Sequence, residues 1–286
     1  MNKIIVMCDS TCDLSEELVN KYDIKVVPLH VSFPNDSKDY LDGVNIFAEE
    51  IYKRCEENGF TPKTGAINIG EFINYFKKYI NDGFDIIYTG IGAELSSSYN
   101  NALVAIKEFE EGRIEIVDSE NLSTGSGLLV LKMCQFRDQG DNVHEIARKV
   151  RLLTKNVSAK FCINTLEYLY KGGRCSGMTS LFASMLKIHP IAKMINGKLT
   201  VYQKPRGKYE KAVDLQIEEF IKDLPCIDKS HIFITHSGRI DGMDEYVYEK
   251  IKQYVPTESI HITRAGCVVS SHCGPKTIGI LYIVNK

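Results

Sequence analysis

The chain has 286 residues, of which 44% are hydrophobic and 25% charged, so it can bury the core of one large domain or of two ordinary ones. Its formal net charge of −2 gives no reason to expect a partner that is nucleic acid or an anionic membrane surface. Nine cysteines without a C-x-x-C pair argue against a zinc site or a disulfide framework. The chain starts with a strand-like segment and has no apolar run of membrane-spanning length, so we expect a cytoplasmic protein.

The first half of the chain alternates strand-like and helix-like segments. Apolar runs predict strands over 3–8, 24–33, 84–91 and 113–117. Helical periodicity marks 15–21, 45–58, 68–80 and 97–110, with two more helices to about residue 154. Asn68 followed by Glu71 is a capping-box pattern. Nearly continuous apolar strands alternating with helices predict a parallel sheet covered on both faces, whose ligands bind at the carboxyl ends of the strands.

The second half predicts a mixed α/β arrangement around one sheet. Strands are expected over 159–164, 191–195, 198–203, 231–235, 259–263 and 277–284. Asn196-Gly197 predicts a hairpin between two of them, and Gly172-Gly173 should end a short helix over 166–171. We therefore expect an α/β fold of two closely packed domains, a parallel-sheet domain over 1–157 and a mixed α/β domain over 158–286.

Four polar segments each follow or adjoin a β-like apolar run, and we expect three of them at the carboxyl edge of the parallel sheet. They are Asp9-Ser10-Thr11, Pro62-Lys63-Thr64-Gly65, Leu95-Ser96-Ser97-Ser98-Tyr99 and Ser271-His272-Cys273-Gly274-Pro275. Hydroxyls, backbone N–H groups and one histidine can hold an oxyanion. Without a base, metal or cofactor they are poor at breaking a bond, so the pattern indicates a binding protein with no metal and no cofactor.

Each segment also has a purely structural interpretation. Asp9-Ser10-Thr11 is either a helix-capping turn or a support for a ligand site. Thr64 is expected in a loop, where alone it would be an ordinary hydroxyl. Ser96 stands where a strand hands over to a helix, so it can cap the helix, contact an anion, or do both. His272 is expected in a turn between two apolar strands, and Arg174 follows a helix end, where it could complement the helix dipole or contact a phosphate.

Other site classes find weaker support. Gly90-Ile91-Gly92 lacks the third glycine of a dinucleotide fingerprint, because Leu95 stands there. Gly274-Pro275-Lys276-Thr277 lacks the upstream glycine of a P-loop. There is no G-x-S-x-G nucleophile elbow. Because triad residues can lie far apart in sequence, a small α/β hydrolase or acyltransferase that uses Ser96 with His272 stays as the alternative.

Five segments in order along the chain resemble the DegV family of bacterial fatty-acid-binding proteins, acyl carriers that work with a fatty acid kinase. They are Asp9-Ser10-Thr11-Cys12-Asp13-Leu14, Pro62-Lys63-Thr64, Leu95-Ser96-Ser97-Ser98-Tyr99, Leu169-Tyr170-Lys171-Gly172-Gly173-Arg174 and His272-Cys273-Gly274-Pro275. The resemblance implies a two-domain α/β fold with a long-chain fatty acid between the domains. It also implies that a separate ATP-dependent kinase phosphorylates the bound carboxylate, so that this chain is a carrier and not an enzyme.

By the same resemblance, Thr64, Ser96 and His272 bind the fatty-acid carboxylate and Arg174 lies where an acyl phosphate or the kinase could contact it. Asp9, Ser10, Thr11, Ser97 and Ser98 are then supporting residues. Three positions depart from the usual family pattern. Gly65 replaces a serine, Ser97-Ser98 stands for Gly-Thr, and Lys276 replaces a glycine, which would bring a cation close to His272.

Overall fold

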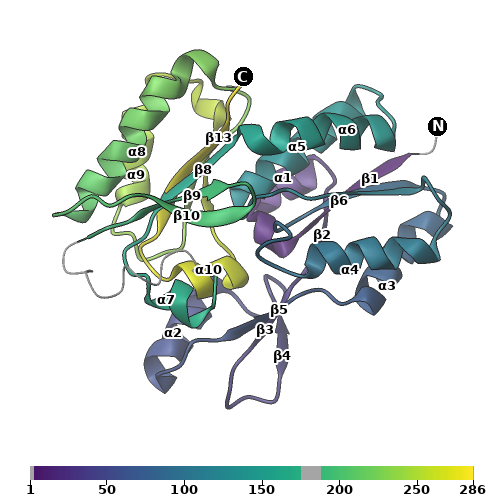
Figure 1. Ribbon diagram of the computed structural model, residues 1–286, viewed down its shortest axis with the longest axis horizontal. Coiled ribbons are helices and arrows are strands. Elements are labelled where there is room, and N and C mark those ends of the chain that lie inside the picture. The colour runs from purple at the N-terminus through teal and green to yellow at the C-terminus, as the bar shows by residue number, and fades with distance from the viewer. Residues whose placement is uncertain (1–2, 175–187, 286) are drawn as a thin grey trace.

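The computed structural model describes residues 3–174 and 188–285 and has two halves, each built on its own sheet (Figure 1). The amino-terminal half holds a four-stranded sheet in the order β2-β1-β6-β7, parallel throughout. Its strands are β1 (Ile4–Asp9), β2 (Lys25–Val27), β6 (Asp85–Thr89) and β7 (Ile114–Val117). The predicted parallel sheet is thereby confirmed.

Helices cover both faces of this sheet, α5 and α6 on one side and α3 and α4 on the other (Figure 1). The helices of this half are α1 (Glu16–Lys21), α3 (Ile69–Asn81), α4 (Ser98–Ala105), α5 (Thr124–Asp138) and α6 (Val143–Leu153). The predicted capping box opens α3, since the side chains of Asn68 and Glu71 accept each other's backbone N–H groups at 2.9 and 2.8 Å.

The carboxy-terminal half holds a six-stranded mixed sheet in the order β10-β9-β8-β13-β11-β12, with β11 and β12 as its parallel pair. Its strands are β8 (Val157–Cys162), β9 (Ile191–Ile195), β10 (Lys198–Gln203), β11 (Ile232–His236), β12 (Ile260–Arg264) and β13 (Ile278–Ile283). Helices α8 (Tyr209–Asp223) and α9 (Met243–Ile251) pack on this sheet. The predicted β9–β10 hairpin forms, because Asn196 and Gly197 both adopt the positive φ that a two-residue hairpin turn requires.

A small antiparallel sheet in the order β4-β3-β5 was not predicted. It consists of β3 (His30–Ser32), β4 (Asp39–Leu41) and β5 (Lys63–Gly65), with α2 (Ala48–Asn58) between β4 and β5 in sequence. The expectation of one strand over 24–33 is wrong, since Pro28 lies between β2 and β3 and offers no N–H to a sheet ladder. The chain therefore leaves the parallel sheet and pairs elsewhere.

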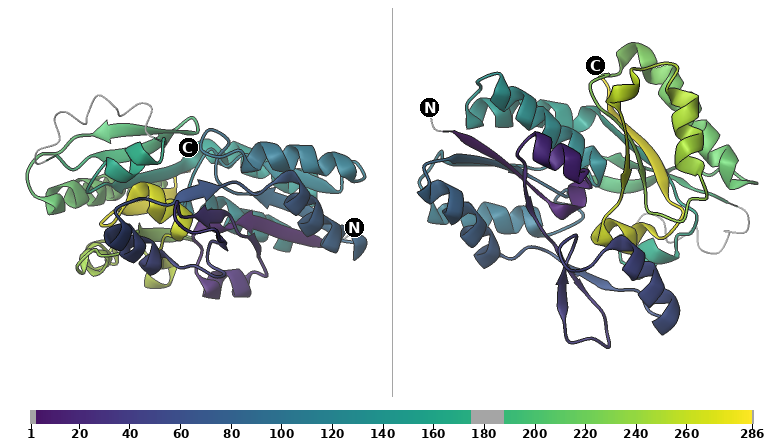
Figure 2. Two further views of the ribbon diagram at one scale, coloured as in Figure 1. Left: turned by 90° about the horizontal axis from the view of Figure 1, so that it is seen from below. Right: turned by 180° about the vertical axis from the view of Figure 1, so that it is seen from behind.

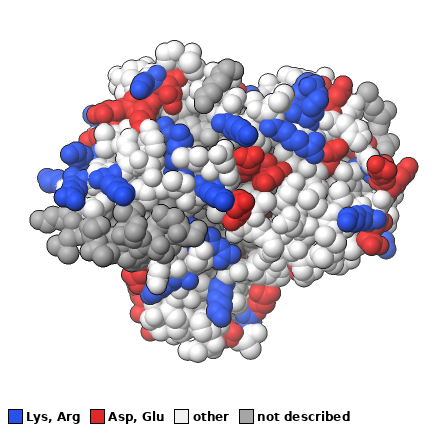
Figure 3. All heavy atoms as spheres, in the orientation of Figure 1, with Lys and Arg blue, Asp and Glu red and all other residues white. Residues whose placement is uncertain are grey.

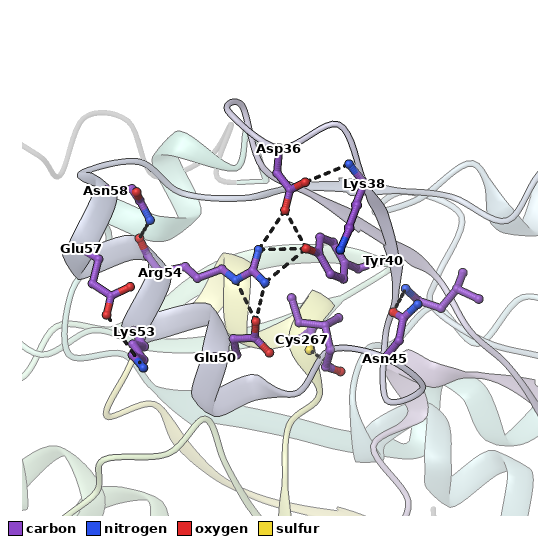
Figure 4. Close-up of polar contacts among 12 residues, drawn as sticks. Asp36, Lys38, Tyr40, Asn45, Glu50, Lys53, Arg54, Glu57, Asn58 and Cys267 are labelled. Atoms are coloured by element: carbon purple, nitrogen blue, oxygen red, sulfur yellow. Dashed lines mark hydrogen bonds and ion pairs between the residues drawn. The ribbon is translucent and has the colours of Figure 1, made fainter.

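Arg54 attaches the β3–β4 hairpin to α2 (Figure 4). Its guanidinium group donates to Glu50 at 2.8 Å, to Asp36 at 3.2 Å and to the Tyr40 hydroxyl at 3.2 Å. It also lies 4.7 Å from the ring centre of Phe33. These contacts satisfy a planar cation on its edges and on one face, so the hairpin and helix form one unit.

Two short helices, α7 (Glu167–Lys171) and α10 (Cys267–Cys273), pack against each other, and α10 also packs against α2, β3 and β5. The view from behind shows α10 beside α2 (Figure 2). Val268 and Val269, which form the β-like apolar run just before the Ser271–Pro275 segment, lie in this helix, because tertiary contacts hold these β-branched residues there. The described residues also include short 3₁₀ helices: η1 (Ser10–Cys12), η2 (Ile106–Glu108), η3 (Thr154–Asn156), η5 (Leu224–Cys226) and η6 (Thr257–Ser259).

The two halves share one hydrophobic core, in which Val6 of β1, Ala159 of β8 and Phe233 of β11 belong to the same buried cluster. Ion pairs of α2 with Arg239 and Arg264 add polar contacts between the halves. Lys and Arg are interspersed with Asp and Glu over the face shown in Figure 3. Within residues 3–174 and 188–285 there is no helix of the length and apolarity that crossing a membrane requires.

Candidate functional site

A cavity of about 190 Å³ lies where loops after β6 and β7 meet β5, α7 and α10. Its apolar lining comes mostly from leucine, isoleucine and valine side chains, namely Leu29, Ile91, Leu95, Leu122, Leu169, Leu199, Val268 and Val269. Its polar lining includes Thr64, Ser96, Ser97, Arg174 and His272. Thus the structure brings the proposed head-group residues of three separate segments, and Arg174 of a fourth, to one cavity.

Thr64 and His272 are in direct contact, with 2.8 Å between Oγ1 and Nε2. Thr64 lies on strand β5 and not in a loop, and His272 lies in the last turn of helix α10 and not in a turn between strands. Only two of the four polar segments, those after β1 and β6, follow strands of the parallel sheet, so the expectation of three is wrong. The contact instead joins the small antiparallel sheet to the carboxy-terminal half.

His272 is partly buried, and its ring is uncharged at neutral pH. Burial lowers its pKa to about 4, and the nearby positive charge of Arg174 acts in the same direction. Nδ1 has no hydrogen-bond partner among the described residues. The ring lies against Gly172, where a Cβ atom would come within 2.1 Å of Nδ1. Gly172 thus provides the space for the imidazole, while Gly173 alone takes the positive φ expected of a helix-ending glycine.

Ser96 has a local structural role and also lies in the lining of the cavity. Its Oγ accepts the N–H of Ser98 at 3.2 Å at the start of α4, and the same residue lines the cavity. Ser98 is fully buried, and its Oγ accepts the N–H of Ile67 at 3.3 Å, which fixes the loop that follows β5. Ser97 lines the cavity beside Ser96. The serine segment therefore attaches the β5 loop to the edge of the parallel sheet.

Asp9 organises the turn after β1 without lining the cavity. Its carboxylate accepts the Thr11 N–H at 3.0 Å, the Thr11 hydroxyl at 2.5 Å and the N–H of Ile91 at 3.0 Å. Burial raises the pKa of Asp9, and these hydrogen bonds oppose that rise. Ser10 accepts the N–H of Leu29 at 3.1 Å. Since Ile91 and Leu29 are both cavity residues, the turn touches the cavity only through its neighbours.

Arg174 also bridges two sides of the cavity. Its Nη1 donates to the carbonyl of Gly172 at 2.7 Å and its Nε to the carbonyl of Leu95 at 3.3 Å. The guanidinium group is exposed, and its positive charge contributes to the lowered pKa of His272. Lys276 does not provide the cation expected close to His272, because its ammonium group pairs with Asp241 at 2.5 Å.

The hydrolase alternative needs a serine hydroxyl hydrogen-bonded to a base, and that base hydrogen-bonded to an acid. Ser96 Oγ contacts Ser98, and His272 Nε2 contacts Thr64 instead of Ser96. Among the described residues no carboxylate bonds to Nδ1. The same part of the chain contains no group of three or more His, Cys, Asp or Glu side chains arranged to hold a metal ion. The described residues therefore do not form a serine–histidine–carboxylate triad at this cavity.

Two features were missed by the sequence interpretation. One is the space that Gly172 leaves for His272. The other is a pair of carboxylates at the start of α10, where Asp13 accepts the Gly266 N–H at 2.7 Å and Asp42 accepts the Cys267 N–H at 2.7 Å. Asp13 belongs to the Asp9–Leu14 stretch singled out above, but nothing in the sequence indicates its partner 253 residues away.

Comparison with known proteins places this chain in one family. The family model described as an uncharacterised protein of the DegV family matches residues 3–285. A DegV domain-containing protein of Clostridium perfringens is 32% identical over 285 residues, covering 99% of both chains. A Thermotoga maritima structure described as revealing a fatty acid binding function is 27% identical, with a TM-score of 0.83 over 99% of this chain and 100% of that one. A Thermus thermophilus DegV family protein, described by its fatty acid binding, shares the fold with a TM-score of 0.90 at 24% identity over 99% of both chains. With a match from the first strand to the last, the chain belongs to the DegV family.

Proposed function

We propose that this chain is a carrier that binds a long-chain fatty acid, with the carboxylate at Thr64, Ser96 and His272. One observation carries the proposal, namely a mostly apolar cavity whose polar lining consists of hydroxyls, a neutral histidine and the Arg174 guanidinium group. Such residues can orient a carboxylate and satisfy its oxygens. The 27% identical Thermotoga protein, described by its fatty acid binding, supports the same ligand class.

The head-group contacts follow from the tautomer of His272. A neutral imidazole carries one N–H, and Nε2 is the nitrogen that has a hydrogen-bond partner, Thr64 Oγ1. With the proton on Nε2, His272 donates to Thr64, and the Thr64 hydroxyl can then donate to a ligand carboxylate. The Ser96 hydroxyl, which lines the same cavity, can provide a second donor. Hydrogen bonds to a charged oxygen are stronger than neutral ones.

The acyl chain is expected to extend away from these groups. A second, smaller cavity shares Leu122, Val269 and Cys273 with the first and none of the polar residues of the head-group site. We place the methyl end of the ligand toward that cavity, between a domain over 1–157 and a domain over 158–286. Each buried methylene contributes about 0.8 kcal/mol, so the acyl chain provides most of the affinity.

The chemistry on the carboxylate then belongs to a partner. A separate ATP-dependent fatty acid kinase would convert the presented carboxylate into an acyl phosphate, and this chain would not be an enzyme. Arg174 is suited to contact the phosphate or the kinase, because its exposed guanidinium group holds only backbone carbonyls in its described hydrogen bonds.

The test combines lipid extraction with head-group variants. Mass spectrometry of the purified protein should find a fatty acid in near one-to-one ratio. The double variant Thr64→Val, Ser96→Ala should retain at least about tenfold less, since each lost hydrogen bond to a charged group is worth about 1.5–3 kcal/mol. Kinase-dependent acyl-phosphate formation should fall in parallel, while the exposed Thr200→Val control leaves both unchanged.

Two outcomes would contradict the proposal. A wild-type protein that holds no fatty acid after gentle purification would exclude the carrier role. Acyl-phosphate formation that is unchanged in the double variant would exclude the proposed head-group residues. Turnover of acyl esters by the isolated protein, lost in a Ser96→Ala variant, would favour the hydrolase alternative.

A further inference from the structure

The amino end of helix α10 is held by two carboxylates from the other half of the chain. Asp42 accepts the N–H groups of Cys267 at 2.7 Å and Val268 at 3.3 Å. Asp13 accepts the N–H of Gly266 at 2.7 Å. Three consecutive backbone donors of α10 are thus satisfied by side chains that lie more than 220 residues away in sequence.

Both carboxylates are buried, Asp42 with 3% and Asp13 with 6% of its surface exposed. Each has one further hydrogen bond, from the hydroxyl of Ser10 to Asp42 at 3.1 Å and from that of Ser123 to Asp13 at 2.5 Å. Both also lie against Gly266, where a Cβ atom would come within 3.0 Å of Asp42 and 3.3 Å of Asp13. The start of α10 is therefore held in place by residues of the amino-terminal half.

The other end of the same seven-residue helix carries His272. A helix this short has little stability of its own in water, so its position is set by what holds its ends and faces. At the carboxyl end the ring of His272 fits between Thr64 and Gly172. A displacement at the amino end would be transmitted over less than two turns to the imidazole.

We propose that Asp13 and Asp42 are positioning residues that set the place of His272 in the ligand site. Neither residue lines the cavity, so both act on the ligand through α10. They also make the site depend on contact between the two halves, because the acceptors come from one half and the histidine from the other. This inference rests on the proposed head-group role of His272.

The first test follows His272 itself, without ligand. In ¹H–¹⁵N NMR spectra of the imidazole nitrogens, a His272→Gln variant assigns the signal of His272 among those of the seven histidines. In the wild-type protein His272 should stay neutral from pH 8 to pH 5, because its pKa is lowered to about 4. In Asp42→Ala the ring should become more accessible and titrate within that range. Asp42→Asn, which keeps one acceptor oxygen for the helix, should show a smaller change.

The second test measures binding of palmitic acid and of hexadecanol, which has no carboxylate. Asp42→Ala should weaken the acid about tenfold or more and the alcohol less than about threefold. In a His272→Gln background the same substitution should change the ratio of the two affinities no further, since coupled residues are not additive. Asp228→Asn is the matched control, because this carboxylate pairs with Lys132 and Ser230 outside the site.

Each outcome has one meaning. An unchanged His272 titration in folded Asp42→Ala and Asp42→Asn proteins would overturn the positioning role. If Asp42→Ala fails to fold, the Asn variant still carries the test. Equal loss of acid and alcohol affinity in both backgrounds would show a general structural role instead. A wild-type protein that does not distinguish acid from alcohol would contradict the proposed function, while the NMR result would still judge the inference.

Discussion

The two sides of the cavity are built in different ways. One side, with Ser96 and Ile91, comes from loops at the carboxyl edge of the parallel sheet, where α/β folds commonly bind ligands. The other side, with Thr64 and His272, comes from a three-residue strand of a separate sheet and a short helix of the other half. The first side is held by contacts within the amino-terminal half, and the second by contacts that join the two halves.

This difference predicts where single substitutions act most strongly. On the sheet-edge side, Asp9 fixes the Ile91 loop within the same sheet. On the α10 side, the imidazole depends on α7, β5 and two remote carboxylates. Substitutions that disturb α10 should therefore cost more ligand affinity than those at a comparable distance on the other side.

Gly172→Val gives the largest expected effect. The new side chain would occupy the place of His272 Nδ1, so the imidazole must move away from Thr64. We expect fatty-acid affinity to fall by roughly 100-fold and stability by about 1–3 kcal/mol, as measured by calorimetric titration and thermal unfolding. Gly173→Ala is the control: it introduces strain of about 1–2 kcal/mol at positive φ but meets no atom within 4 Å. Normal affinity in Gly172→Val would show that the α10 side does not determine binding.

The pH dependence of stability tests the burial of His272. Its pKa is lowered to about 4 in the folded protein, against about 6.5 in the unfolded chain. Between these values the unfolded state binds more protons, so stability falls as the pH drops from 6.5 to 4, by up to about 3 kcal/mol for this group. His272→Gln should lose that part of the slope in denaturant titrations, while His231, whose pKa is also lowered to about 4, contributes equally to both proteins. Identical slopes would mean that His272 is not buried as described.

Val269→Phe tests whether the second cavity receives the acyl chain. Val269 belongs to α10 and borders both cavities. A phenyl ring there should exclude the last methylenes of a long ligand, and three excluded methylenes at about 0.8 kcal/mol each correspond to roughly 50-fold weaker binding. Palmitic acid should lose more affinity than decanoic acid in a displacement assay, whereas Val269→Ala should not favour the shorter chain. Equal losses for both acids would place the methyl end elsewhere.

Much of the fold was predictable because its signals are local. The Asn68–Glu71 capping box and the Asn196-Gly197 hairpin formed as expected. Pro28 interrupts the apolar run over 24–33, and disregarding it gives one predicted strand where the structure has two, β2 and β3. The β-branched pair Val268-Val269 favours a strand, but it lies in a helix, because Asp13 and Asp42 bind the N–H groups at the start of α10.

The sequence indicated the polar residues that line the cavity, but it did not indicate their geometry. Ser96 follows a parallel strand, so its place at the sheet edge could be foreseen from the order of elements. The Thr64–His272 contact spans 208 residues and joins two elements that the sequence interpretation had described as a loop and a turn. The family resemblance assigned both residues to one head-group site. Their contact, with 2.8 Å between Thr64 Oγ1 and His272 Nε2, is seen only in the folded structure.

Arg54→Ala should have the smallest effect on binding. It tests how far from the cavity a contact can lie and still affect the α10 side. Arg54 holds the β3–β4 hairpin on α2, but its contacts do not reach the cavity residues (Figure 4). Its partly exposed ion pairs and ring contacts are worth about 1–2 kcal/mol together, so thermal stability should fall while fatty-acid affinity changes less than about threefold. Lys53→Ala on the same helix is the control, because its 3.9 Å pair with Glu57 is largely exposed and should change neither quantity. If fatty-acid affinity fell together with stability, the position of Thr64 on β5 would depend on the whole small sheet. The contacts that position His272 and Thr64 would then include the β3–β4 hairpin.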